Sequence, residues 1–238
     1  MRLLYAELLK IRTAPWTTVI LVLSLVAITV LGAGSTLATA DDIFGSPDVV
    51  GDVVSISHIA LVFGLLFGIL IVTWDYRHGT ITQTFLAAPR RERVVLAKLA
   101  TAVLVGVALV LLALAIGIVM GKAWLGGDFV IVRENWEEMG RVVAAGALWA
   151  MFGAGVGAIL QTQVGALVSS LIWFLVVEPI VMGLRPRIGT YLPGNALDAF
   201  VSGSDRLSRG NAASVAAAYA VVAAAIGTAS VLRRDVSS

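Results

Sequence analysis

Six long apolar runs dominate the pattern of hydrophobic and polar positions along this chain. Each is about 20 residues or more, the length that a helix needs to cross the hydrocarbon core of a bilayer. Backbone polar groups find no water in lipid, and the runs are continuous instead of alternating, so helices are favoured over a membrane barrel. We therefore expect an all-α polytopic membrane protein, with one transmembrane domain over residues 1–238 and spans at 17–36, 56–74, 94–120, 142–160, 164–184 and 212–232.

Spacing within the runs predicts how the helices meet. Only Gln161, Thr162 and Gln163 separate the fourth run from the fifth, which predicts a tight helical hairpin. The third run is long enough to tilt or to project beyond the bilayer. Glycines four residues apart let helices approach closely, and we expect most such pairs to act within the chain. These pairs are Gly64 and Gly68, Gly117 and Gly121, and Gly153 and Gly157.

Composition supports the membrane class and adds an orientation. The chain is 59% hydrophobic and 13% charged, and it has no cysteine, which removes disulfides and thiolate chemistry. The net charge of +2 is interpreted as topology and not as affinity for nucleic acid, because in a membrane protein the distribution of Lys and Arg matters most. One set of polar segments holds Arg2, Lys10, Arg12, Arg77, Arg90, Arg91, Arg93, Lys98, Arg233 and Arg234. The other set holds Lys122, Arg133, Arg141, Arg185, Arg187, Arg206 and Arg209.

This bias of ten basic residues against seven predicts which side each segment occupies. We expect both termini and residues 75–93 in the cytoplasm, and the acidic segment 41–52 outside. Residues 1–16 have an apolar stripe with polar interruptions and end in Pro15 and Trp16. This pattern favours an amphipathic helix lying on the membrane surface. A plain basic flank of the first span is the alternative.

The segment 75–93 is too structured in its sequence to be a simple solvated loop. Gly79 interrupts it, and Thr80 then offers a helix cap to a short helix with Phe85 and Leu86 on its apolar face. Pro89 ends that helix. A partly apolar face with a basic end would suit docking into a groove on another protein. Positive-inside topology alone would explain the arginines, but not the other features.

The order acid, Gly-Thr, Pro, Arg and Lys in this region resembles the membrane subunits of type 2 ABC (ATP-binding cassette) exporters of the small six-span bacterial type. The surface helix, the six spans and the motif "YLPGNALDAF" before the last span share in the resemblance, although the family more often has Glu at the place of Asp75. The resemblance implies a helix that sits on a partner ATPase. Its candidate coupling residues are Asp75, Arg77, Gly79, Thr80, Phe85, Leu86, Pro89, Arg91 and Lys98.

The resemblance also implies partner subunits, and it implies that ATP and Mg bind to these partners and not to this chain. Two cytoplasmic ATPase subunits would carry ATP and Mg, and a second permease subunit, the same or a related chain, would complete a dimer in the bacterial cytoplasmic membrane, surrounded by lipid. At least one of the glycine pairs would then serve the seam between the two permease subunits. We expect no enzyme activity and no cofactor in this chain, since a phosphate-binding loop needs G-x-x-x-x-G-K-[ST]. The nearest stretch, "IGIVMGKAW", has its first glycine one place too close and Ala123 in place of Ser or Thr.

Glu178 is the one acid well inside an apolar run, and Pro179 follows it. Pro179 is expected to kink or end the helix. Both are candidates for a substrate path or gate, whereas pairing of Glu178 with Arg185 or Arg187 is the structural alternative. A proton-coupled transporter with Glu178 as relay, or a membrane scaffold, is the rival to the ABC exporter. The outer loop 185–211 is expected to dip into the outer leaflet, by resemblance, through a short helix after Pro193 and Gly194.

Overall fold

The computed structural model describes residues 15–39, 47–77, 79 and 91–233. Within these ranges every regular element is a helix. Six helical segments are long and apolar enough to cross a membrane, by length and composition. This confirms the expected all-α, six-span, multi-pass fold. The segments are Thr17–Thr39, Val49–Arg77, Glu92–Asp128, Arg133–Leu160, Gln163–Leu184 and Arg209–Arg233.

The first span is α2 (Pro15–Thr39), which begins at a proline. Proline suits the first helical position because its fixed φ matches the helix and its missing N–H would be unbonded there in any case. Pro15 therefore starts the span as well as bounding the segment before it. The expected surface helix lies outside the described residues, apart from Pro15 and Trp16, which belong to α2.

The second span starts earlier than its apolar run predicts. It consists of α3 (Pro47–Ser55), one turn of 3-10 helix, η2 (Ile56–His58), and α4 (Ile59–Arg77). The added helix α3 is amphipathic: Val49, Val50, Val53 and Val54 are buried, while Asp52 and Ser55 are exposed. Because α3 has a polar face, a search for continuous hydrophobicity places the start of the span after this helix.

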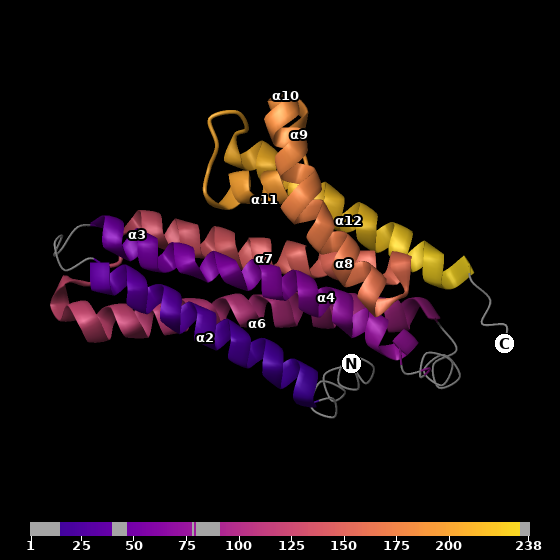
Figure 1. Cartoon of the computed structure of the whole chain (residues 1–238), viewed down its shortest axis with the longest axis horizontal. Helices are drawn as coiled ribbons and strands as arrows, with labels where there is room; N and C mark the ends of the chain where they lie inside the picture. Colours follow the sequence, from indigo (N-terminus) through magenta and orange to yellow (C-terminus); the bar gives the residue numbers. More distant parts are fainter. Residues whose placement is uncertain (1–14, 40–46, 78, 80–90, 234–238) are drawn as a thin grey trace.

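The third and fourth spans are also longer than their apolar runs. Helix α6 (Arg91–Leu125) has 35 residues, which corresponds to about 52 Å at 1.5 Å per residue. After the 3-10 turn η3 (Gly126–Asp128), α7 (Arg133–Leu160) begins nine residues before the predicted start. Its first turns bury Asn135 and Met139. These helix ends lie with α3 and the end of α2 at one end of the bundle (Figure 1).

Helix α7 is central to the fold and packs against α4, α6 and α12 (Arg209–Arg233). Glycine makes the close approach to α4 possible, because a Cβ on Gly68 would overlap the carbonyl of Ala150, and one on Gly153 would overlap that of Leu65. Gly117 and Gly121 face Val53 and Phe129 of their own chain. All three predicted glycine pairs therefore act inside the chain, and the expected seam with a second subunit is not made by them.

The predicted hairpin between the fourth and fifth spans is confirmed. Gln161 ends α7 in the left-handed conformation, with φ of 56°, and its N–H donates to the Gly157 carbonyl at 2.9 Å. The fifth span follows as α8 (Gln163–Ile172), a five-residue π-helix η4 (Trp173–Val177) and α9 (Glu178–Leu184). This hairpin lies at the same end of the bundle as the end of α4 and the start of α6 (Figure 1).

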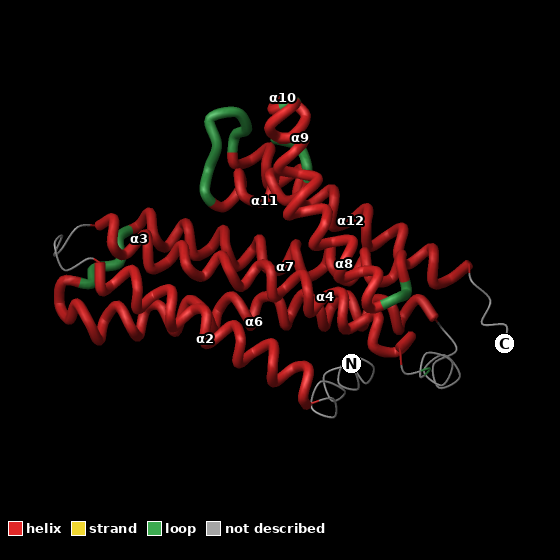
Figure 2. The backbone as a smooth tube through the Cα atoms, viewed as in Figure 1, coloured by secondary structure: helices red, strands yellow, loops and turns green. Residues whose placement is uncertain are grey.

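The predicted outer segment, between the fifth and sixth spans, folds back on the bundle as two short helices, α10 (Pro186–Gly189) and α11 (Pro193–Val201). The predicted helix after Pro193 is confirmed as α11, which buries Leu197 and Val201. Figure 2 shows α10 and α11 beside the end of α9, with a loop joining α11 to α12. The fifth span itself is mostly exposed: only 17% of its most apolar window is buried, against 67% in the second span.

Candidate functional site

Asp75 and Lys98 form a buried ion pair at the base of the 78–90 segment. Lys98 Nζ lies 2.6 Å from Asp75 Oδ2, and their side chains are 4% and 3% exposed. The same ammonium donates to the Ile71 carbonyl at 3.2 Å. Asp75 belongs to the last turn of α4 and Lys98 to the second turn of α6, so the pair joins the two helices that border the segment. Both residues were assigned to the expected coupling region, and the structure brings them together.

Both ends of the predicted segment 75–93 are helical, because α4 continues to Arg77 and α6 starts at Arg91. Arg77 Nη1 donates to Gln163 Oε1 at 3.0 Å and thereby contacts the start of α8. Gly79 has φ of +66°, a conformation that favours glycine, and this agrees with its expected role as a chain break. The other expected coupling residues, Thr80, Phe85, Leu86 and Pro89, lie outside the described residues.

Glu178 is buried, with 3% exposure, and its carboxylate accepts three hydrogen bonds. The Trp173 indole N–H and the Gly194 backbone N–H donate to Oε1, each at 2.9 Å. The Asn195 backbone N–H donates to Oε2 at 3.0 Å. Glu178 therefore caps the N-terminus of α11, where free N–H groups attract a negative charge. Its partners come from this helix end and from Trp173, whereas the alternative partners, Arg185 and Arg187, are exposed.

Pro179 explains the unusual geometry just before Glu178. A proline has no N–H to continue the helix ladder and its ring crowds the preceding turn. The Glu178 N–H reaches back five residues to the Trp173 carbonyl, as in a π-helix. The expected kink at Pro179 thus takes the form of a π-helical turn, and α9 resumes with Glu178 and Pro179 in its first turn. This widened turn carries Trp173 and Phe174.

An apolar cavity of about 270 Å³ lies beside this turn, between α7, α8, η4, α11 and α12. Phe152 and Phe174 are among its walls, and they form an aromatic cluster with Trp149. The Trp149 and Phe152 rings stack with centroids 5.2 Å apart, and the Phe174 ring lies 4.9 Å from Trp149. Pro193, the first residue of α11, also lines the cavity. The Glu178 cap and the cavity therefore share the same stretch of chain.

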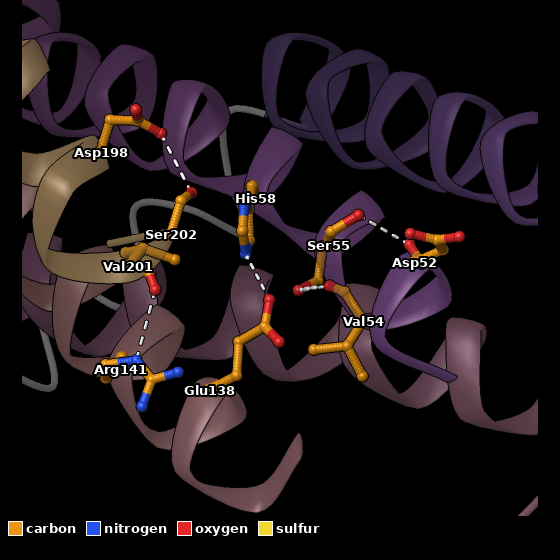
Figure 3. A network of polar contacts seen from close by, with 10 residues as sticks. Asp52, Val54, Ser55, His58, Glu138, Arg141, Asp198, Val201 and Ser202 are labelled. Atoms are coloured by element: carbon orange, nitrogen blue, oxygen red, sulfur yellow. Dashed lines mark hydrogen bonds and ion pairs between the residues drawn. The ribbon is translucent and has the colours of Figure 1, made fainter. Parts of the chain in front are cut away.

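A polar network joins α7 to its neighbours nearer the end of the bundle that carries α3 (Figure 3). His58 Nε2 of η2 lies 3.3 Å from Glu138 Oε1 of α7. One turn further along α7, Arg141 Nε donates to the Val201 carbonyl of α11 at 3.3 Å. Asp198 of α11 accepts from the Ser202 hydroxyl at 3.1 Å. These contacts hold η2 and α11 against α7.

Sequence reasoning missed the donors to Glu178 and the polar network on α7. Gly194 and Asn195 are 16 and 17 residues from Glu178, and the contact depends on how the outer segment folds back. The motif Leu-Pro-Gly-Asn did indicate a helix start at this place. Glu138 and Arg141 occur in an amphipathic turn that precedes the apolar run, and no periodic signal connects them to His58.

Comparison with models of protein families finds no match to this chain, and comparison with curated proteins finds none either. The functional assignment therefore rests on the residues and their geometry.

Proposed function

We propose that this chain is the membrane-spanning permease subunit of an ATP-driven ABC exporter. In this proposal a separate ATPase hydrolyses ATP with Mg, and the permease couples that hydrolysis to substrate efflux. The complex has two ATPase subunits and two permease subunits in the bacterial cytoplasmic membrane, with both termini of each permease in the cytoplasm. The sequence resemblance and the six apolar helices support this assignment.

The observation that carries the proposal is the buried Asp75–Lys98 pair. A segment that receives force from an ATPase must be fixed to the helices that it moves. The ion pair joins α4 and α6 at the two borders of residues 78–90, and the Arg77–Gln163 bond extends the connection to α8. A push on the segment would then be shared by three helices and would move them together, as in rigid-body transitions.

The rival function, a proton-coupled transporter with Glu178 as relay, has less support. A relay must exchange its proton with mobile water or neighbouring carriers. The carboxylate of Glu178 is instead held by three donors that fix a helix end. Reconstituted vesicles would separate the two functions, because the exporter requires the ATPase and ATP, whereas the rival responds to a pH gradient alone.

Copurification with the candidate ATPase tests the proposal directly. Phe85→Asp and Leu86→Asp place a charge on the expected docking face and should reduce recovery of the ATPase at least tenfold. Val130→Asp is the matched control, because Val130 is an exposed apolar residue at the opposite end of the bundle. Equal recovery with all three variants would remove the docking role from residues 78–90.

A further inference from the structure

The cavity beside the π-helical turn has walls of a distinctive chemistry. Phe152 of α7, Trp173 and Phe174 of η4 and Tyr219 of α12 contribute four aromatic rings. No charged side chain is among its lining residues within the described part of the chain. Rings prefer offset or edge-to-face contact with other rings at centroid distances of about 4.5–7 Å. The walls therefore suit an aromatic ring, and they offer no side chain of opposite charge to an ion.

Three polar groups at or beside the cavity already have hydrogen-bond partners within the protein. The indole N–H of Trp173 donates to Glu178, and the carboxylate of Glu178 also accepts two hydrogen bonds from the backbone of α11. The hydroxyl of Ser169, which also lines the cavity, donates to the Ala166 carbonyl at 3.3 Å. Trp173 is therefore left with its apolar ring for contact with a ligand, and Glu178 is not available as a counter-ion.

The volume sets the size of the ligand. An apolar cavity of about 150 Å³ in another protein holds one benzene molecule. At about 270 Å³, this cavity has room for one or two fused rings. Access comes from the exposed side of the fifth span, because Ser169 and Trp173 are both exposed on that face. A ligand that enters here is one that dissolves in the lipid phase.

We propose that this cavity binds one uncharged aromatic molecule of one or two rings, taken up from the membrane. Glu178 is a positioning residue for the site: it holds Trp173 and the Pro193–Gly194 turn, which form two of the walls. The proposal deepens the proposed export function, on which it rests, by naming the substrate class. Binding itself needs neither ATP nor the ATPase.

Saturable photolabelling of the full chain in lipid nanodiscs tests the site. The probe is 3-phenyl-3-(trifluoromethyl)diazirine, and excess naphthalene is the competitor. Labelling of Phe152, Trp173 and Tyr219, located by mass spectrometry, should fall at least fivefold with the competitor. Labelling of Leu175, which is 71% exposed to the surroundings, should not change. If the competitor does not reduce labelling of the cavity residues, lipid chains occupy the space, and the proposal is overturned.

A filling variant adds a second test. Ser169→Phe places a ring in the cavity and should lower saturable labelling at least fivefold. Val168→Phe makes a similar change at the neighbouring exposed position, which does not line the cavity, and should leave labelling intact. Loss of labelling in both variants, or in neither, contradicts the site. If Ser169→Phe does not fold, the competition on the wild-type chain decides alone.

The two proposals fail separately. The labelling is done without the ATPase, so its failure leaves the coupling role untouched. Failure of the ATPase to copurify would likewise leave a positive labelling result in place, and the cavity would then be a ligand site in a membrane protein of another class.

Discussion

Lys98 reaches across from α6 to Asp75 at the end of α4, and water is almost fully excluded from both side chains. The Ile71 carbonyl accepts a second bond from the ammonium. A buried ion pair is costly to break from one side, because the remaining charge is then left in an apolar environment. The junction of α4 and α6 is therefore rigid as long as both residues are present.

Replacing Lys98 alone should destabilise the fold strongly. Lys98→Met leaves Asp75 buried without its cation, which costs about 3–5 kcal/mol. The double variant Asp75→Leu with Lys98→Met should recover most of this loss, because an apolar pair fills the space without a charge. Denaturant unfolding in detergent measures both. Arg93→Gln, an exposed change on the same helix, is the control. Equal stability of Lys98→Met and wild type would contradict the rigid junction.

Glu178→Gln should loosen the start of α11. The amide of Gln presents an N–H₂ group where Glu178 presents an acceptor, so at least one of the three donors loses its partner, at a cost of about 1–3 kcal/mol. We expect a lower midpoint of thermal unfolding and a change in Trp173 fluorescence. Arg185→Gln and Arg187→Gln should change neither. If either arginine variant reproduced the effect of Glu178→Gln, Glu178 would be held by an ion pair with that arginine and not by the N-terminus of α11.

Two glycines of α7 should respond in opposite directions to alanine. A Cβ on Gly155 would lie 2.5 Å from the Ala223 carbonyl carbon of α12, so Gly155→Ala forces the helices apart; overpacking of this kind costs about 1–3 kcal/mol. A Cβ on Gly140 meets nothing within 4 Å. Gly140→Ala should therefore stabilise the helix by about 0.5–1 kcal/mol, since alanine loses less backbone entropy. Thermal unfolding of the two variants, compared with wild type, checks the sign of each change.

The absence of native cysteine makes topology easy to measure. Gly127→Cys lies in the exposed turn between α6 and α7 and should react with an impermeant maleimide added to intact cells. Ser237→Cys should react only after the membrane is opened. The charge bias of the sequence predicts these sides. Labelling of Ser237→Cys from outside would reverse the orientation and move residues 78–90 away from the ATP of the cytoplasm.

The sequence predicted the architecture well where the signal is local. Continuous hydrophobicity locates all six spans, and the three polar residues after Leu160 locate the hairpin. Helix α3 and the first turns of α7 were missed, because the polar face of an amphipathic helix interrupts a continuous apolar run. The coupling residues Phe85 and Leu86 stay a prediction, since they lie outside the described residues.

Long-range contacts were beyond the reach of sequence patterns. An acid in an apolar run indicates that a partner must exist, but it does not say which one. Two arginines close in sequence were natural candidates for Glu178, yet a helix N-terminus 16 residues away supplies two of its donors. The glycine pairs were recognised as contact surfaces, but only the packing of the helices showed that their partners are within the same chain.

The cap on α11 has a consequence for how the protein is made. During synthesis Glu178 emerges before Gly194 and Asn195, so the fifth helix reaches the membrane-insertion machinery before two of its donors exist. A lone charge at the centre of a helix costs about 2.5–3.5 kcal/mol during such insertion. This cost is relieved only when α11 folds back against α9 and its backbone N–H groups bind Glu178. The fifth helix and the outer segment therefore form one unit of insertion, and a nascent chain ending at Leu184 would hold its last helix in the membrane less firmly than a chain ending at Val201.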